Sequence, residues 1–463
     1  MQMDKTIVAL ATPPGRSGIG VVRLSGKGAL AIAASLAGRA DFEPREATLA
    51  PLSDPQSGDL IDEAIITFFA APKSYTGEDV IEIACHGSPV VLRRVIDVCL
   101  AGGARLAEAG EFTLRALANG RIDLAEAEAI RDLIDAQTQA SARQAVRQMR
   151  GEFSHQLQPI KDELLDIIVV LESAIEFVED DLPEIQAEGV KKRLAEIARL
   201  IGGVADTYQA GRLIREGLRV ALVGRPNVGK SSLFNALLGH DRAIVTEVAG
   251  TTRDQLHEKI TIGDIPISLW DTAGLRETSD VVETIGVERS RRTMADADLV
   301  LVMLDASENV TAEDREIIAG AASLNHLIAV NKIDKVDKSS TANIEEWLLG
   351  RDGESPAAVT PFVKISAKTG EGLEDLRAAI IGPFLGREIE TSGFLVTDAR
   401  HYDLLRRAQG EIEASCGLLQ SRTSEEIVLV GLHNALRYLG EITGETTTED
   451  VLTRIFATFC IGK

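Results

Sequence analysis

The hydrophobic residues at the start of the chain form short runs separated by glycine-containing turns. These runs occupy residues 6–10, 20–24, 64–69 and 80–83. Short runs of apolar, often β-branched residues between turn residues are typical of strands. A longer stretch from Pro89 to Ala101 predicts one helix. Residues 6 to about 117 are therefore expected to form an α+β domain.

The pattern changes from about residue 122, where glycine becomes rare and apolar residues recur at helical spacing. One stripe, in steps of four and three residues, comprises Leu164, Ile168, Leu171, Ile175 and Val178. This spacing places the five side chains on one face of a long helix. An acidic segment and a proline follow, so we expect the helix to end there. A second helical run covers residues 189–213.

Strands and helices alternate from Leu218 to about Leu385, and helical spacing then returns at residues 403–419 and 427–439. The amphipathic stripes on either side must be buried, and the simplest arrangement packs them together around an inserted domain. The predicted fold is multidomain, with an α+β N-terminal domain, an all-α helical domain and an inserted α/β domain. The predicted segments are 1–118, 119–215, 216–384 and 385–463, of which the second and fourth are the halves of the helical domain.

A phosphate-binding loop opens the inserted domain. The sequence Gly224-Arg-Pro-Asn-Val-Gly-Lys-Ser231 fits the pattern G-x-x-x-x-G-K-[ST], and it lies between a predicted strand and a predicted helix. Glycines allow backbone N–H groups to surround phosphate oxygens, and the helix N-terminus lies behind the anion. We therefore expect Lys230 at the β and γ phosphates and Ser231 on Mg²⁺.

Further motifs, each after a predicted strand, identify the base as guanine. Asp334 of Asn331-Lys-Ile-Asp334 can accept from guanine N1–H and N2–H₂ together, which adenine cannot match. The segment Asp271-Thr-Ala-Gly274 supplies a carboxylate for Mg²⁺ and an N–H for the γ-phosphate, and Thr252 is the expected second hydroxyl on Mg²⁺. Ser366-Ala-Lys368 suits the loop at guanine O6, so the inserted domain is predicted to be a Ras-like (TRAFAC) P-loop GTPase. The predicted GTP-binding residues are Asn227, Val228, Gly229, Lys230, Ser231, Ser232, Thr246, Glu247, Val248, Ala249, Gly250, Thr251, Thr252, Asp271, Thr272, Ala273, Gly274, Asn331, Lys332, Asp334, Ser366, Ala367 and Lys368.

The residue after the aspartate motif departs from the Ras-like pattern. Ras-like GTPases have a glutamine there to orient the attacking water, and Leu275 cannot hydrogen-bond. The sequence assigns no arginine finger either. Arg276, Glu277 and Glu283 are candidate replacements, although each is also explained as a solvated charge. Asn227 lies inside the phosphate loop, where its side-chain oxygen can ligate a monovalent cation.

Composition narrows the class of protein. A hydrophobic content of 45% and a charged content of 26% are ordinary for a soluble globular protein. No uncharged apolar run reaches the length of about 18 residues that a transmembrane helix needs, and the start lacks a signal-peptide layout. The four cysteines form no C-x-x-C pair, so neither disulfides nor a zinc site is expected, and a cytoplasmic location is predicted. The net charge of -22 means that an RNA substrate would require a local basic patch or a basic partner.

Four further segments do not occur in generic small GTPases. They are Ala11-Thr-Pro-Pro-Gly-Arg-Ser-Gly-Ile-Gly20, Ser74-Tyr-Thr-Gly-Glu-Asp-Val80, Gly110-Glu-Phe-Thr113 and Phe459-Cys-Ile-Gly-Lys463. With them the whole chain resembles the MnmE (TrmE) family of tRNA-modification GTPases. The resemblance implies a homodimer, an N-terminal domain that binds a folate, a split helical domain and an inserted G domain. It also implies a flavoprotein partner, MnmG (GidA), which carries FAD and uses NADH. Together the two proteins would add a carboxymethylaminomethyl or aminomethyl group to C5 of the wobble uridine (U34) of certain tRNAs, with a one-carbon unit from a tetrahydrofolate derivative in the 5-formyl or methylene form.

The resemblance also assigns residues near the γ-phosphate. Asn227 matches the family's K⁺ ligand, and Thr246, Val248 and Thr251 match the loop that completes the ion's coordination, the last two through backbone oxygens. A potassium ion there would replace the missing arginine finger, because it places positive charge where negative charge develops in the transition state. Glu283 matches the carboxylate implicated in hydrolysis, through a water bridge. Pairing of two G domains across the dimer is implied as well.

For the folate, Arg23, Glu82, Arg121 and Lys463 match the family's binding positions. A pterin ring offers a donor–donor edge to a carboxylate, and its glutamate tail needs cations. Some family members have lysine where this chain has Arg121, so the charge is kept but the geometry differs. Cys460 lies in the terminal motif, which suggests a catalytic role at the one-carbon site, although a free cysteine is more often a small buried hydrophobic residue.

Two other functions are compatible with part of this pattern. A ribosome-assembly GTPase would carry a KH-like RNA-binding module after the G domain, whereas this chain continues with helices. A scaffold that binds GTP and folate as signals, and leaves the chemistry to a partner, is not separable from an enzyme by sequence.

Overall fold

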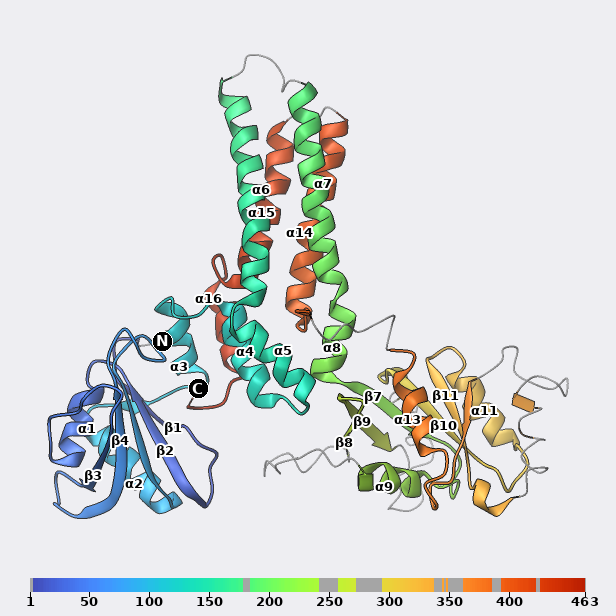
Figure 1. Cartoon of the computed structure of the whole chain (residues 1–463), viewed down its shortest axis with the longest axis horizontal. Coiled ribbons are helices and arrows are strands. Elements are labelled where there is room, and N and C mark those ends of the chain that lie inside the picture. Colours follow the sequence, from blue (N-terminus) through green and yellow to red (C-terminus); the bar gives the residue numbers. More distant parts are fainter. Residues whose placement is uncertain are drawn as a thin grey trace, which may run out of the picture. The chain divides into compact units, whose positions relative to one another are not determined.

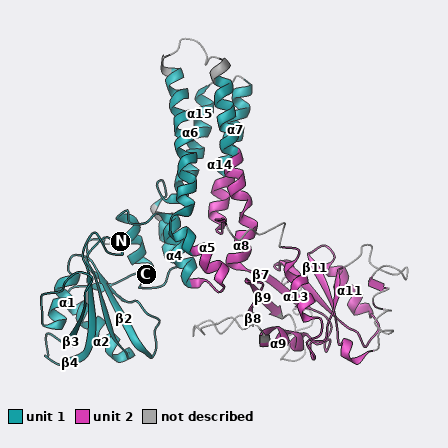
Figure 2. Ribbon diagram, in the orientation of Figure 1, with its two compact units in different colours: residues 1–134, 146–198, 407–463 teal, residues 135–145, 199–406 magenta. Residues whose placement is uncertain are grey.

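A computed structural model describes residues 3–177, 184–240, 257–271, 294–336, 344, 347–348, 361–384, 393–421 and 425–462. The chain divides into two compact units (Figure 2). Unit 1 comprises residues 1–134, 146–198 and 407–463, and unit 2 comprises residues 135–145 and 199–406. Because unit 1 continues on both sides of residues 199–406, the α/β part of the chain is an insertion. The predicted boundaries of the four segments stay predictions.

A six-stranded sheet forms the first part of unit 1, in the order β3-β4-β5-β2-β1-β6. Neighbouring strands are antiparallel except for β1 and β6, which are parallel. The elements are β1 (Ile7–Leu10), β2 (Ser17–Ser25), α1 (Ala29–Ala37), β3 (Ala47–Ser53), β4 (Leu60–Phe69), β5 (Val80–Gly87), α2 (Pro89–Ala101), β6 (Arg105–Leu106) and α3 (Glu111–Ala118). The predicted helix at 89–101 is therefore confirmed.

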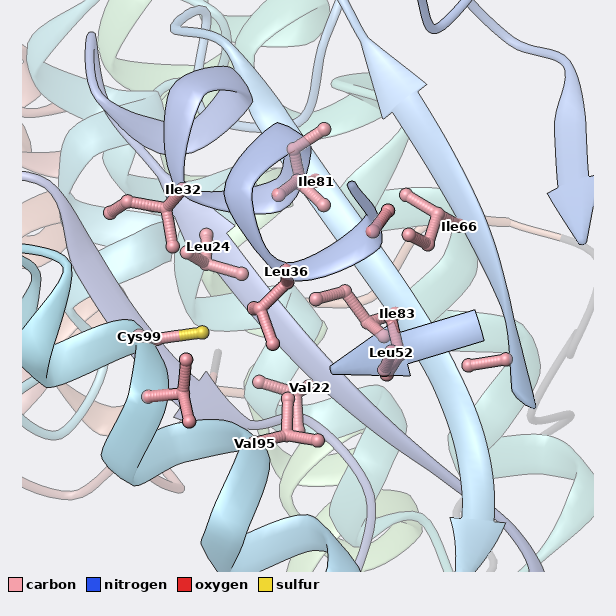
Figure 3. Close-up of a cluster of buried hydrophobic side chains, with 14 of the residues drawn as sticks. Val22, Leu24, Ile32, Leu36, Leu52, Ile66, Ile81, Ile83, Val95 and Cys99 are labelled. Carbon is pink, nitrogen blue, oxygen red and sulfur yellow. The ribbon is translucent and has the colours of Figure 1, made fainter. Parts of the chain in front are cut away.

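The core of this sheet lies on the face that α1 and α2 cover (Figure 3). Val22 and Leu24 of β2 pair in register with Ile83 and Ile81 of β5, and all four side chains are buried in this core. Successive side chains of a strand point to opposite faces. The residues between them, the cross-strand pair of Arg23 and Glu82, therefore lie on the opposite face of the sheet.

A buried arginine, Arg115 of α3, joins two of the segments that the sequence singled out. Its side chain is 1% exposed and donates hydrogen bonds to Glu111 Oε1 and Glu78 Oε2, both at 2.9 Å. It also donates to the backbone oxygen of Lys5 at 2.8 Å. Arg105 donates to both carboxylate oxygens of Glu111, at 2.7 and 2.6 Å. Burial raises the pKa of Glu111, but the bonds from Arg105, a backbone N–H and Arg115 outweigh it and hold that pKa below its usual range.

The long helices of unit 1 pack side by side as a bundle (Figure 1). An ion pair of 2.5 Å between Glu163 and Arg193 joins α6 to α7, and His433 of α15 lies 3.2 Å from Glu172 of α6. The helices of this part are α4 (Leu124–Asp135), α5 (Gln139–Met149), α6 (Glu152–Phe177), α7 (Glu184–Asp206), α14 (Ala399–Gln420), α15 (Glu425–Thr443) and α16 (Glu449–Phe456). Parts of α5, α7 and α14 belong to unit 2.

The predicted stripe of α6 is confirmed over most of its length. Leu164, Ile168 and Leu171 are buried, with at most 1% of each residue exposed. The prediction is wrong for Ile175, which is 38% exposed because it lies in the last turn of α6, where fewer neighbours cover it. Val178 lies outside the described residues.

The helical run predicted at 189–213 is two helices, α7 and α8 (Tyr208–Glu216), separated at Thr207. The hydroxyl of Thr207 donates to the backbone oxygen of Val204 at 2.7 Å and accepts from the N–H of Val396 at 3.0 Å. Side-chain bonds of this kind compete with the helical backbone pattern, which explains the interruption.

Unit 2 contains a second six-stranded sheet, in the order β12-β11-β10-β7-β9-β8, with all pairs parallel except β8 and β9. Helices α9 and α13 pack against a core on one face, and α11 packs against a core on the other. This is the doubly wound arrangement that the alternating pattern predicts. The elements are β7 (Leu218–Val223), α9 (Lys230–His240), β8 (His257–Ile262), β9 (Ile265–Asp271), β10 (Leu299–Asp305), α11 (Ala312–Ala321), β11 (His326–Asn331), η1 (Ile333–Lys335), β12 (Phe362–Lys364) and α13 (Leu373–Ile381).

Among the helices of the described residues, none is both long enough and apolar enough to cross a membrane.

Candidate functional site

The phosphate loop joins β7 to α9, as the sequence predicts, and its backbone conformation needs glycine at two places. Gly224 has φ +151°, and a Cβ there would lie 2.7 Å from the backbone oxygen of Met303. Gly229 has φ +102°, and a Cβ there would overlap the side-chain amide of Asn331. Asn227, between them, is also left-handed, with φ +66°. The loop is therefore a tight turn against the neighbouring strand ends, in front of the N-terminus of α9.

Lys230 lies at this loop, with 6% of the residue exposed. Its ammonium donates to the backbone oxygens of Gly224 and Arg225, at 2.7 and 2.8 Å. Ser231 and Ser232 follow in the first turn of α9 and are exposed. A lysine charge and an exposed hydroxyl thus meet at the helix N-terminus, which is the arrangement a phosphate with a bound metal ion requires.

The two motifs expected at the guanine base contact each other and the phosphate loop. Asn331 is 2% exposed, donates to the backbone oxygen of Val228 at 2.9 Å and accepts from the N–H of Ala367 at 3.0 Å. Ser366 donates its hydroxyl to Asp334 Oδ1 at 2.7 Å, which orients an otherwise exposed carboxylate. Lys368, one residue beyond Ala367, is exposed.

Two charged groups at this site were assigned no role by the sequence. Asp305, at the end of β10, pairs with Lys332 at 2.5 Å. Burial raises the pKa of Asp305, but the hydrogen bonds from Lys332 and Ser307 outweigh it and keep that pKa below its usual range. Arg225 of the phosphate loop pairs with Asp314 of α11 at 2.8 Å and with Glu308, in the connection between β10 and α11, at 2.9 Å. The one sequence signal for Asp305 is a carboxylate directly after a continuous apolar run.

Several predicted site residues lie wholly or partly outside the described residues. Asp271 ends β9, and the structure describes its backbone but not its side chain. The predicted residues that lie outside the described residues are Thr246, Glu247, Val248, Ala249, Gly250, Thr251, Thr252, Thr272, Ala273, Gly274, Glu283 and Lys463.

The predicted folate positions in unit 1 come together around Arg23. Its guanidinium donates from Nε and Nη2 to Glu82 Oε1, at 2.9 and 2.8 Å. Its Nη1 donates to the backbone oxygen of Gly462 at 3.2 Å. The rings of Tyr75 and Phe112 lie 5.5 and 5.8 Å from the guanidinium carbon, within cation–π range. The two aromatic residues belong to segments that the sequence singled out, but their place at this site was not predicted.

Arg121 is exposed, and within the part of the chain that the structure describes it forms no hydrogen bond or ion pair with Arg23 or Glu82. Its aliphatic stem lies against Gly77, where a Cβ would come within 3.2 Å of it. Gly77 is two residues from Tyr75. The structure thus places Arg121 near the segment that borders the site, without bringing it into the Arg23–Glu82 pair.

The C-terminal segment is held against the N-terminal sheet by its backbone. Ile461 forms a bridge with Ala109, and the oxygen of Cys460 accepts from the N–H of Gly110 at 3.4 Å. Gly462 has φ +99°, and a Cβ there would overlap the backbone oxygen of Leu10. Only glycine fits this close approach. The thiol residue Cys460 is exposed rather than buried as free cysteines usually are.

Comparisons with known proteins cover the whole chain. Residues 124–460 match the family model described as the MnmE helical domain, and residues 6–121 match the one described as the GTP-binding protein TrmE N-terminus. The tRNA modification GTPase MnmE of Koribacter versatilis (strain Ellin345) is 46% identical, and that of Aquifex aeolicus (strain VF5) is 43% identical; each alignment covers 100% of both chains. Among solved structures, Era of Aquifex aeolicus bound to GDP and AlF₄⁻ is 28% identical and covers 42% of this chain and 66% of its own, with a TM-score of 0.30, which is too low to compare the folds.

The predicted fold class is thereby confirmed: an α+β N-terminal domain, a helical domain and an inserted P-loop GTPase domain. The chain belongs to the MnmE family of tRNA modification GTPases.

Proposed function

We propose that this chain is a potassium-dependent GTP hydrolase that acts on tRNA together with a flavoprotein partner and a tetrahydrofolate derivative. Family membership supports GTP hydrolysis and tRNA modification. The folate part of the proposal depends most on one observation, the junction of Arg23, Glu82 and the Gly462 carbonyl. This junction brings the Glu82 carboxylate, the Arg23 guanidinium and the C-terminal segment together. It lies on the face of the sheet opposite the one that α1 and α2 cover.

Asp334 would recognise the guanine base. Ser366 holds its Oδ1, and Oδ2 accepts no hydrogen bond from the other described residues. A fixed carboxylate can accept from guanine N1–H and N2–H₂, and a base that lacks these donors would leave it unpaired, which costs binding free energy. Asn331 ties this motif to the phosphate loop, so the base and phosphate subsites would move as one body.

The ammonium of Lys230 would bind the phosphates of the nucleotide. This ammonium already lies at the loop, where it is bonded to two backbone oxygens. Phosphate oxygens carry charge and are stronger acceptors than backbone oxygens, so the lysine would exchange partners when nucleotide binds. Mg²⁺ would be held by Ser231 and Thr252, of which Ser231 is exposed in the first turn of α9, as this role needs.

The residues present fit a potassium ion as far as they are described. Asn227 is exposed, and none of the described residues hydrogen-bonds to its side-chain amide, so its oxygen is available as a ligand. Oxygens of amides and carbonyls are the ligands that replace the hydration shell of K⁺. Thr246, Val248 and Thr251 would complete the shell. The ion would supply positive charge near the γ-phosphate, and Glu283 would position water through a bridge, in place of the missing glutamine.

The tetrahydrofolate derivative fits the Arg23–Glu82 pair. Both bonds from Arg23 end on Glu82 Oε1, and Oε2 accepts none from the described residues, so the carboxylate retains an acceptor for the pterin edge. Arg121 and Lys463 would bind the glutamate tail. Cys460 is exposed in the same terminal segment, and a role at the one-carbon unit is part of this proposal. A homodimer would pair two G domains, and the partner MnmG would supply FAD for modification at U34.

GTP turnover in potassium and sodium tests the first half of the proposal. We expect turnover at least about tenfold faster in potassium chloride than in sodium chloride, since one added charge contact at the transition state changes the rate by that order. Equal rates in the two salts would refute potassium dependence.

Folate binding tests the second half. We expect Glu82→Gln to weaken binding of 5-formyltetrahydrofolate about tenfold or more, as measured by calorimetry, because a charged hydrogen-bond acceptor is lost. Glu63→Gln is the matched control, because Glu63 is an exposed carboxylate on the neighbouring strand β4. Unchanged affinity in Glu82→Gln would remove this site from the proposal. Mass analysis of wobble uridine in cells that carry Cys460→Ser decides the role of the thiol.

A further inference from the structure

Asp305 is the last residue of β10, and no sequence motif contains it. β10 lies between β7 and β11, so its C-terminal end lies between the phosphate loop and the guanine motif. In the register of β10 and β11, Asp305 is opposite Asn331. Its side chain is 4% exposed, so its charge must be balanced by close partners.

The partners of Asp305 form a bridge to the phosphate loop. Ser307 donates its N–H and its hydroxyl to Asp305 Oδ1, at 2.9 and 2.6 Å. Lys332 donates to the other oxygen, Oδ2, at 2.5 Å. The same ammonium donates to the backbone oxygen of Asn227 at 2.7 Å. One carboxylate thus holds the lysine, and the lysine holds the phosphate loop at Asn227.

Both ends of the lysine bridge have an uncommon backbone conformation. Lys332 has φ +67° and Asn227 has φ +66°. Asparagine tolerates the left-handed region, whereas lysine occupies it at a cost in free energy. Such a conformation persists where the surrounding contacts over-determine it. For Lys332 these contacts include the two bonds of its ammonium, to Asp305 and to the Asn227 carbonyl, and the bond that its own carbonyl accepts from the N–H of Lys335 at 3.0 Å.

We propose that Asp305 is a positioning residue for the GTPase site: it holds Lys332 so that the lysine fixes the backbone, and hence the side-chain direction, of the cation ligand Asn227. This inference rests on the proposed potassium dependence. Asp305 acts through Lys332 and is not itself a ligand of the nucleotide or the cation. At neutral pH it is a carboxylate, because the hydrogen bonds that it accepts keep its pKa low despite its burial.

The test is Asp305→Asn, which keeps the shape of the side chain and removes its charge. We expect the potassium concentration for half-maximal GTP turnover to rise about tenfold, while kcat at saturating potassium changes by less than about threefold. We also expect the Kd of a fluorescent GDP analogue, measured in sodium chloride without potassium, to rise at least about threefold, because Lys332 also borders the base subsite.

Asp298→Asn is the matched control. Asp298 directly precedes β10, at the other end of the same strand, and accepts from Arg212 at 3.0 Å and from the N–H of Arg219 at 2.9 Å. It is similarly paired, with a side chain 18% exposed, but it is remote from the nucleotide edge. We expect it to lower the melting temperature without changing the potassium response or the affinity for the GDP analogue.

Two outcomes would overturn the inference alone: a normal potassium response in Asp305→Asn, or an equal shift in Asp298→Asn. If the wild-type protein shows no potassium response, the proposed potassium dependence fails, and this inference fails with it. Should Asp305→Asn not fold, Ser307→Ala removes one bond to the same carboxylate, and a smaller shift in the same direction is expected. An unchanged response in Ser307→Ala would then count against the bridge.

Discussion

Replacing Arg115 with methionine is expected to loosen the N-terminal part of unit 1, at a residue that has no direct role in either proposed site. Methionine keeps much of the length of the side chain but has no hydrogen-bond donor. The change removes the bonds to Glu78, Glu111 and the Lys5 carbonyl from a position that is 1% exposed. It therefore tests whether the buried cluster is essential to the stability of α3 and the sheet.

The magnitude follows from what remains after the change. Removing one partner of a buried ion pair costs about 3–5 kcal/mol, because the other charge is left unbalanced. Here Glu111 keeps both bonds from Arg105, and Glu78 is 26% exposed, so water can solvate it. We therefore expect the lower end, about 3 kcal/mol.

Hydrogen exchange of the intact protein, followed by mass spectrometry, is the suitable assay. Both tryptophans, Trp270 and Trp347, lie in unit 2, so their fluorescence does not report on α3. A loss of about 3 kcal/mol corresponds to roughly 100-fold faster exchange of protected amides in α3. The control is Arg39→Met, which removes an ion pair with an exposed aspartate, and for which no change in exchange is expected.

The pH dependence provides a second check on the same cluster. Because the folded-state pKa of Glu111 is lowered, its contribution to stability is present above the ordinary glutamate pKa and is lost as the pH falls through the lowered value. The stability difference between the wild type and Glu111→Gln should therefore shrink below about pH 4. Unchanged exchange in Arg115→Met, or a difference that does not depend on pH, would refute the reasoning.

Three further predictions concern single residues. Gly462→Ala should weaken binding of 5-formyltetrahydrofolate about tenfold or more in calorimetry, because a Cβ there overlaps a backbone oxygen of β1. GTP turnover should be unchanged, and a normal folate affinity would contradict the prediction. Ser366→Ala should raise the KM for GTP about tenfold with little change in kcat, because Asp334 loses the hydroxyl that orients its carboxylate. A fall in kcat without a change in KM would contradict this prediction. At pH 8 iodoacetamide should label the exposed Cys460 well before Cys85, because burial raises the pKa of the Cys85 thiol to about 12. Mass mapping of the labelled peptides over time measures the order of labelling.

Local hydrophobic patterns in the sequence predicted those strands that end at a recognisable nucleotide-binding motif. The strand predicted directly before the phosphate loop is confirmed as β7, because a buried apolar run meets a glycine loop there. The strand β10 was not predicted, although its residues form a continuous apolar run. The role of Asp305 depends on the order of β7, β10 and β11 in the sheet, and strand order is not expressed in the residues near Asp305. A carboxylate after a strand becomes informative only when its neighbours in space are known.

The site around Arg23 shows the same limit more strongly. Arg23 and Glu82 were predicted as site residues only from the family resemblance, because their pairing depends on the register of β2 and β5. The bond from Arg23 to the Gly462 carbonyl joins residues 439 positions apart, a separation over which no local pattern is informative. The break between α7 and α8 was missed for a similar reason, because Thr207 ends the helix by bonding to the distant Val396.

The bond between Arg23 and the Gly462 carbonyl has a consequence for the synthesis of the protein. At roughly 5–20 residues per second, a ribosome needs about 20 to 90 s to add the 439 residues that separate the two partners. During that interval the sheet of unit 1 and the inserted sheet of unit 2 can both fold, while the site around Arg23 still lacks its contact with Gly462. A ribosome that stalls late would release a chain with an intact nucleotide domain and an incomplete Arg23 junction. Completion of this junction therefore requires that translation has passed Gly462.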